Sequence, residues 1–200
     1  DTTLAQARVL VDFTQIDAEQ WMTNGPAFGR EPVRPGQIRP GTDRSQPIEY
    51  IFDEHAAQTN PAWADLHVAP GTERESEQIG WVQAGRTLRT RSFTLAGGKL
   101  HYLVRGNGHV YAAIDSHRMV KGPLHKASLL NISAGDGWRW VTQNLSDYSG
   151  HVVHLEFTPR KDGSEPAQDF AIASVIESKK APPPSHNSHI LAIAQRTQGD

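Results

Sequence analysis

Four histidines recur at an interval of eight residues: His101, His109, His117 and His125. An Asp-Ser-His triplet at 115–117 lies among them, and a Trp-Arg-Trp triplet at 138–140 follows. If each strand and its turn takes about eight residues, equivalent positions come side by side, and the four imidazoles meet at one edge of a sheet. The segment 101–140 is therefore the first place to expect a bound ligand.

Segment 115–125 has polar side chains where a predicted strand ends and a loop begins. Asp115, His117, Arg118 and His125 carry the groups that hydrogen-bond the hydroxyls of a sugar or another polyol. Two alternatives stay open. Asp115 forms an Asx-turn beside a solvent-facing His117 and Arg118, or Asp-x-His with a distant histidine holds zinc or another transition ion.

Trp138 and Trp140 lie two residues apart on a predicted strand, so their rings face the same side of the sheet. On an outer face the rings form a flat platform on which a pyranose ring stacks. On an inner face they belong to the core, where large aromatic side chains are common. Tyr111 and Trp63 are further aromatic candidates. Exposed indoles favour a binding module, and buried indoles favour a structural domain.

Short runs of alternating or β-branched residues recur along the chain and predict strands. The predicted strands are 7–14, 48–52, 79–83, 87–95, 99–105, 109–115, 127–132, 138–145, 151–158 and 169–177. Gly-rich turn sequences separate them, for example Gly106-Asn107-Gly108 and Ala134-Gly135-Asp136-Gly137. This pattern predicts an all-β domain, an antiparallel β-sandwich of the jelly-roll, galactose-binding-like type.

The chain divides into a β-sandwich domain at 1–178 and a Pro-rich linker with a C-terminal tail at 179–200. Within the domain, the Pro- and Gly-rich stretch at about 25–72 predicts long loops over one end of the sandwich. Loops of that length are usually functional or partly mobile. Asn60-Pro61 fits the start of a helical turn.

Charge and composition exclude several functions. With 20 basic and 22 acidic residues and a formal net charge of -2, the chain has no continuous positive field, so nucleic acid is not an expected partner. No apolar run is long enough for a membrane helix, so no membrane partner is expected. The absence of cysteine excludes disulfides, thiolate metal sites, a cysteine nucleophile and a covalently attached c-type haem in this segment.

The acidic residues predict binding of a metal rather than catalysis. There is no nucleophile elbow, no zinc-binding helix motif and no suggestive carboxylate pair, so we do not expect an enzyme. The first and last strands of sandwiches are often neighbours, which brings Asp12, near Asp17 and Glu19, towards Asp169, near Asp162 and Glu165. With backbone carbonyls, Asp12 and Asp169 then hold a structural calcium. The alternative is that these carboxylates are solvated in loops.

The chain resembles a family over about Val9 to Ser178. The matching pieces are NGPAFG at 24–29, DSHRMVKGPLH at 115–125 and GWRWVTQNLSDYSGH at 137–151. In these it is similar to the β-sandwich domain of large planctomycete proteins that also carry c-type cytochrome domains. The resemblance implies an extracytoplasmic location, a likeness to the carbohydrate-binding modules of polysaccharide-degrading enzymes, and a structural calcium. The haem-attachment motif of such proteins belongs to other domains and is missing here.

We therefore expect a non-catalytic carbohydrate-binding module that binds a polysaccharide or oligosaccharide and has neighbouring domains in the same chain. The expected sugar contacts are Asp115, His117, Arg118 and His125 with Trp138 or Trp140, and Tyr111 in reserve. One alternative is a structural or interaction domain that positions neighbouring cytochrome or enzyme modules. Another is a histidine-based metal site for hydrolysis or redox chemistry.

Overall fold

The computed structural model describes residues 6–16, 18–41, 43–67, 69, 81–116, 127–161 and 167–182. In these residues the regular structure consists of β-strands and short 3₁₀ turns, and every pair of strands is antiparallel. No helix in the described part of the chain is long and apolar enough to cross a membrane. The predicted all-β, antiparallel fold is confirmed.

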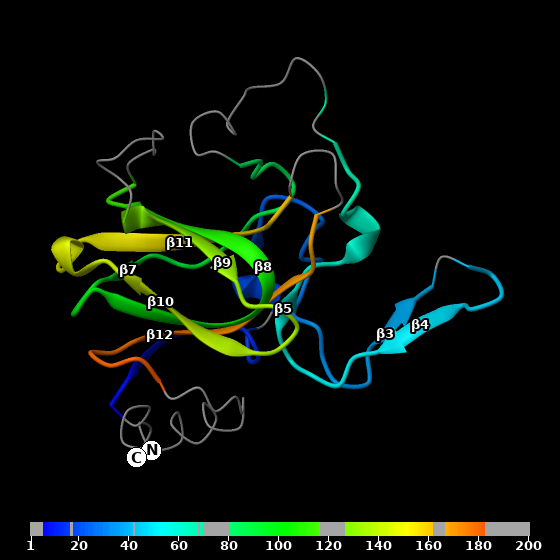
Figure 1. The fold of residues 1–200 in the computed structure, drawn as a ribbon, viewed down its shortest axis with the longest axis horizontal. Helices are drawn as coiled ribbons and strands as arrows, with labels where there is room; N and C mark the ends of the chain where they lie inside the picture. Colours follow the sequence, from blue (N-terminus) through cyan, green and yellow to red (C-terminus); the bar gives the residue numbers. More distant parts are fainter. Residues whose placement is uncertain are drawn as a thin grey trace.

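In the described residues, the strands form two sheets. The strands are β1 (Arg8–Asp12), β2 (Met22–Thr23), β3 (Ile38–Pro40), β4 (Ile48–Ile51), β5 (Ala57–Gln58), β6 (Leu88–Arg89), β7 (Phe93–Thr94), β8 (Lys99–Ile114), β9 (Leu129–Ser133), β10 (Arg139–Asn144), β11 (Val152–Pro159) and β12 (Phe170–Glu177). The 3₁₀ turns are η1 (Ala18–Gln20), η2 (Pro61–Trp63) and η4 (Ser146–Tyr148). β3 and β4 form a separate hairpin that projects from the main sheet (Figure 1).

The main sheet curls into two layers around β8, as Figure 1 shows. The first half of β8 pairs with β10 and β12, and its second half pairs with β9 and β11. The core lies between the layers, where Phe157 meets Tyr102 edge-on at 5.4 Å and Phe13 edge-on at 6.3 Å. β1 lies beside β12, so the prediction that the first and last strands are neighbours is confirmed.

The predicted turn at Gly106-Asn107-Gly108 is wrong, because these residues are a bend inside the 16-residue strand β8. Gly106 has a φ of 83°, and a Cβ there would collide with the Asp169 carbonyl. A Cβ on Gly108 would lie 2.7 Å from the Phe170 ring. The glycines therefore let the start of β12 pack close against the bend and let β8 change layers, which is a usual role for glycine inside a strand.

This bend also corrects the prediction that the histidines meet at one sheet edge. His101 and His109 lie on the same strand, about 26 Å apart along the chain. Their partners differ, because His101 contacts Thr142 whereas His109 contacts Asn131 and stacks on Trp81. His117 and His125 lie outside the described residues.

Two other predicted strands differ from the observed ones. The predicted strand at 87–95 is split into β6 and β7 because Thr90 interrupts the ladder: the Leu155 N–H donates to the Thr90 hydroxyl at 2.9 Å. The predicted strand at 79–83 carries no strand in its described residues 81–83. The helical turn after Asn60 is confirmed as η2, and the Asn60 side chain accepts a hydrogen bond from Ala62 N at 3.0 Å.

Glu177, at the end of β12, anchors the loop between β7 and β8. Its Oε1 accepts hydrogen bonds from the backbone N–H groups of Ala96, Gly97 and Gly98 at 2.7–2.9 Å. Its Oε2 lies 2.8 Å from the Arg8 guanidinium. Backbone N–H groups that point at one oxygen stabilise a negative charge, so this buried carboxylate joins the end of β12 to the 96–98 loop and to the start of β1.

His101 is a buried structural residue. Its Nε2 lies 3.2 Å from the Ser178 carbonyl, which can only accept, so Nε2 carries the proton. Its Nδ1 lies 2.8 Å from the Thr142 hydroxyl. Burial lowers the pKa of His101, against a smaller opposing effect of the Ser178 carbonyl and with a small contribution from Lys99.

We expect the stability of the domain to fall as the pH drops below 6.5, the ordinary pKa of histidine. Because the folded-state pKa of His101 is lower, the unfolded chain binds the proton first, and the free energy of unfolding falls until the pH reaches the folded-state pKa. The measurement is the free energy of unfolding in urea, determined for the wild type and for His101→Gln at several pH values. An equally steep fall in His101→Gln contradicts the assignment; His55→Gln, at an exposed histidine, is the control.

We expect Gly108→Ala to lower the free energy of unfolding by about 1–3 kcal/mol, the usual effect of overpacking. The added methyl group meets the Phe170 ring, which is buried and has little room to move. Gly137→Ala is the matched control, because a Cβ there meets nothing within 4 Å. Denaturant unfolding gives the free energy of unfolding of both variants, and equal values would show that the β8 bend tolerates a side chain at this position.

Candidate functional site

Asp115 lies at the end of β8 and is held by the chain that leads into β11. Its Oδ2 lies 2.5 Å from His151 Nδ1, and its Oδ1 accepts a hydrogen bond from Val152 N at 3.0 Å. Asp115 and Ser116 both have positive φ values, of 50° and 60°. The Asp115 carboxylate therefore fixes a strained strand end. His117, Arg118 and His125, the other predicted polar contacts, lie outside the described residues.

Trp138 and Trp140 pack on the same apolar cluster, which includes Leu103 and Ile176, so the prediction that both rings share one side is confirmed. Both indoles are half-buried. The Arg105 guanidinium lies 5.2 Å from the Trp138 ring centroid. Arg105 lies ten residues before Asp115, in the half of β8 that pairs with β10 and β12, whereas Asp115 follows the half that pairs with β9 and β11. The Trp pair and Asp115 therefore belong to different layers of the domain.

The reserve aromatic residues differ in exposure. Tyr111 is only 6% exposed and packs with Ala113, Trp81 and Leu129, so its ring offers no surface to a sugar. Trp63, in η2, is 40% exposed.

The structure does not bring the two predicted calcium ligands together. Asp12 pairs with Ser174 in the β1–β12 ladder, whereas Asp169 lies five residues earlier, about 16 Å along that strand. Asp12 instead accepts hydrogen bonds from Thr14 N at 2.9 Å and from its hydroxyl at 2.5 Å. Across the described residues, no three His, Asp or Glu side chains are placed to hold a metal. Asp17, Asp162 and Glu165 lie outside them, and calcium stays a prediction.

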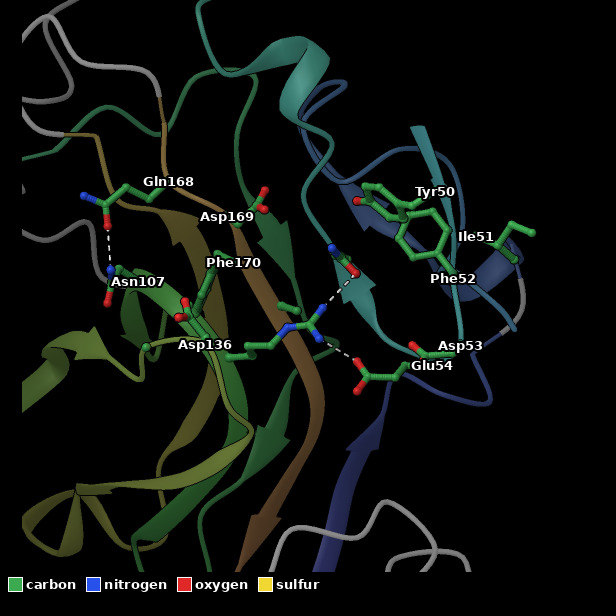
Figure 2. Close-up of a pocket in the computed structure, with 15 residues that line it drawn as sticks. Tyr50, Ile51, Phe52, Asp53, Glu54, Asn107, Asp136, Gln168, Asp169 and Phe170 are labelled. Carbon is green, nitrogen blue, oxygen red and sulfur yellow. Dashed lines mark hydrogen bonds and ion pairs between the residues drawn. The ribbon is translucent and has the colours of Figure 1, made fainter. Parts of the chain in front are cut away.

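A cleft of about 430 Å³ opens beside the bend of β8 (Figure 2). One wall is the chain from Tyr50 to Glu54, at the end of β4, with Gln58 in β5. The other wall is the bend at 105–107, the turn at 135–136 and the chain at 168–171. Backbone hydrogen bonds between Gly106 and the 134–135 turn, at 2.8 and 2.9 Å, hold that second wall together.

Arg105 joins the two walls. From β8 it donates to Glu54 Oε2 at 2.8 Å and to Gln58 Oε1 at 3.3 Å, the interactions drawn in Figure 2. Its guanidinium also lies near the Trp138 ring. Because a planar guanidinium can satisfy several partners in fixed directions, Arg105 sets the separation of the walls.

Tyr50 and Phe52 form an aromatic wall, with ring centroids 5.1 Å apart and ring planes at 71°. Arg39, buried beneath them, lies 4.5 Å from the Tyr50 ring and 5.2 Å from the Phe52 ring. It also donates to the Thr59 carbonyl at 3.3 Å. Burial raises the pKa of Tyr50, so its phenol stays neutral and able both to donate and to accept a hydrogen bond.

The polar lining of the cleft is made of carboxylates and amides. Asn107 Nδ2 donates to Gln168 Oε1 at 2.6 Å. Arg105 balances Glu54, whereas Asp53, Asp136 and Asp169 are exposed along the rim. Such groups donate to and accept from hydroxyls, while the excess of carboxylates disfavours an anionic ligand. The arrangement suits a polyol that lies against an aromatic surface.

Of these cleft residues, only Asp169 was predicted to bind a ligand, as a metal ligand; Asn107 and Asp136 were predicted only as turn residues. Tyr50 and Phe52 lie in the stretch 25–72, which was predicted to form long functional loops. This stretch supplies one wall of the cleft. Arg105 and Asn107 were missed because Gly106 and Gly108 indicate a turn, and a turn would have separated these residues instead of placing them on one wall.

No protein-family model matches the chain, and no curated protein matches its sequence. Among solved structures, part of the chain is similar to a glycoside hydrolase family 43 arabinoxylan arabinofuranohydrolase from Bacillus subtilis, in complex with cellotetraose. The identity is 17%, the TM-score is 0.32, and the match covers 46% of this chain and 19% of that one. A likeness of that size carries no argument about function, and the resemblance to planctomycete domains stays an expectation.

We expect Arg105 and Glu54 to be coupled. A double-mutant cycle with Arg105→Met and Glu54→Gln, measured by urea unfolding, should give a coupling free energy of about 0.5–1 kcal/mol, because both side chains are partly exposed. A cycle that pairs Glu54→Gln with Arg139→Met is the control, since Arg139 is exposed. Additive effects for Arg105 and Glu54 would contradict a structural role of the ion pair.

Proposed function

We propose that this chain is a non-catalytic carbohydrate-binding module of a larger extracytoplasmic protein, and that it binds an uncharged oligosaccharide segment in the cleft beside the β8 bend. The observation that carries the proposal is the juxtaposition, in one cleft, of the Tyr50–Phe52 aromatic wall with amide and carboxylate side chains.

A pyranose ring matches both kinds of surface. Its C–H face packs on an aromatic ring, and its hydroxyls need donors and acceptors in fixed directions. Tyr50 and Phe52 supply the first, and Asn107, Gln168 and Asp136 supply the second. The volume of about 430 Å³ lies within the usual range for a pocket that holds a small ligand.

The negative charge at the rim of this cleft restricts the class of glycan that it can bind. Asp53, Asp136 and Asp169 repel phosphate, sulfate or carboxylate groups at the cleft mouth, which fits the overall formal charge of -2. The same carboxylates accept hydrogen bonds from neutral hydroxyls. An uncharged glycan therefore suits the cleft better than an acidic glycan or a nucleic acid.

A second candidate is an interaction domain that contacts a neighbouring domain of the same protein. The hairpin β3–β4 carries Ile38, Ile48 and Ile51 with 49%, 47% and 60% of their surface exposed. Ile38 and Ile51 are directly opposite each other in the ladder. Adjacent exposed isoleucines on a projecting hairpin are typical of a protein contact.

We expect Tyr50→Ala and Asp136→Ala to weaken glycan binding. Loss of a stacking ring corresponds to about 0.5–1.5 kcal/mol, and loss of one hydrogen bond to a similar amount, or about 2–13-fold in Kd. Affinity electrophoresis against a panel of neutral polysaccharides selects the ligand, and calorimetry with its oligosaccharide gives the Kd of each folded variant.

Asp147→Ala and Ile48→Ser are the matched controls, because Asp147 is an exposed carboxylate in η4 and Ile48 lies on the hairpin but does not line the cleft. Unchanged binding by Tyr50→Ala together with loss of binding by Trp138→Ala would move the site to the tryptophan pair. Absence of binding to every neutral polysaccharide contradicts the proposal and leaves the interaction domain.

A further inference from the structure

A second cleft, of about 340 Å³, lies where the chain at 66–67 meets residues 81–86 and the end of β11. Its polar lining is cationic or nitrogen-bearing: His67, Trp81, Arg86 and Lys161. None of the described residues that line it carries a carboxylate. This charge is opposite to that of the cleft beside the β8 bend.

Two buried hydrogen-bond donors in this cleft have no partner. Among the described residues, the buried side-chain atoms without a hydrogen-bond partner are Trp81 Nε1, Arg86 Nη1 and Glu177 Oε2. Glu177 Oε2 faces the Arg8 guanidinium in an ion pair, so Trp81 and Arg86 remain. Both line the second cleft.

Arg86 is held in place for binding. Only 5% of its surface is exposed, and its Nη2 donates to the Leu66 carbonyl. The Trp81 ring is fixed by stacking on His109, with centroids 4.3 Å apart and planes at 8°. Both donors are shielded from bulk water, and an unpaired buried donor, especially a charged one, is strongly unfavourable.

Lys161 adds a second positive charge. Its Nζ lies 3.4 Å from the Ala64 carbonyl, a long contact that leaves further N–H groups of the ammonium for another acceptor. A guanidinium, an ammonium and an indole N–H around one cleft are complementary to an anion with several hydrogen-bond acceptors. A planar or tetrahedral oxyanion satisfies them together.

We propose that this second cleft binds an oxyanion, a carboxylate or sulfate group carried by a small ring-sized molecule. Arg86 and Lys161 bind the charge, Trp81 Nε1 donates a hydrogen bond, and the apolar remainder of the lining contacts the body of the ligand. This site is separate from the proposed glycan cleft and does not depend on it.

The test is titration of the ¹⁵N-labelled chain with D-glucuronate, inorganic sulfate and, as the uncharged match, D-glucose. The readout is the Trp81 indole N–H signal, assigned by its loss in Trp81→Phe. Titration to about 20 mM covers a ligand of millimolar affinity. We expect a saturable shift with glucuronate, sulfate or both, and none with glucose.

Arg86→Met should weaken anion binding at least tenfold, and Lys161→Met a few-fold with a reduced salt dependence. If Arg86→Met does not fold, Lys161→Met and Arg86→Lys still test the assignment. The matched control is Arg91→Met, at an exposed arginine outside the cleft.

An absence of any saturable shift would mean that the two donors are satisfied by buried water, and it overturns the proposal. An equal shift with glucose, or undiminished binding by the folded Arg86 and Lys161 variants, overturns it as well. Binding of neutral glycans in the first cleft has no bearing on these outcomes, so the two proposals fail separately.

Discussion

The close approach of the start of β12 to the bend of β8 is the constraint on which the rest of the structure depends. Gly106 and Gly108 remove the Cβ atoms that would meet Asp169 and Phe170, so β8 bends and passes from one layer to the other. One strand then belongs to both layers of the sandwich, and the core aromatic residues pack between its halves. Without the bend, β8 would run straight and the layers would not face each other.

The bend also creates the main cleft. It turns Arg105, Asn107 and the 134–136 turn towards the chain at 50–58, and Arg105 links the two walls through Glu54 and Gln58. The residues that give the fold its corner therefore also place the candidate binding groups on one wall of the main cleft, whereas the chain at 50–54 supplies the other wall. The two clefts differ in charge: carboxylates lie on the rim of the first, whereas Arg86 and Lys161 line the second.

Most strands were predictable. β9 and β10 are partly exposed and show the alternation of a half-buried strand, whereas β11 and β12 are buried almost throughout and are rich in apolar and β-branched residues. The bend was not predictable, because a Gly-x-Gly sequence is locally the same in a turn and in a strand that bends around a neighbouring side chain. Only Phe170, more than sixty residues later, distinguishes the two. The prediction of a shared binding site was wrong for the same reason. Asp115 and Trp138 are near in sequence but separated along β8, while Tyr50 and Asn107 are far apart in sequence and line one cleft.

The central claim is that a glycan binds where the bend of β8 faces the end of β4. Mapping of backbone amide shifts during titration with the selected neutral oligosaccharide tests it most directly. The account predicts that the largest shifts fall at 50–54, 105–107, 135–136 and 168–169, on both walls of the cleft. Saturable shifts that cluster instead around Asp115 and His151, or around Trp138 and Trp140 alone, would contradict it.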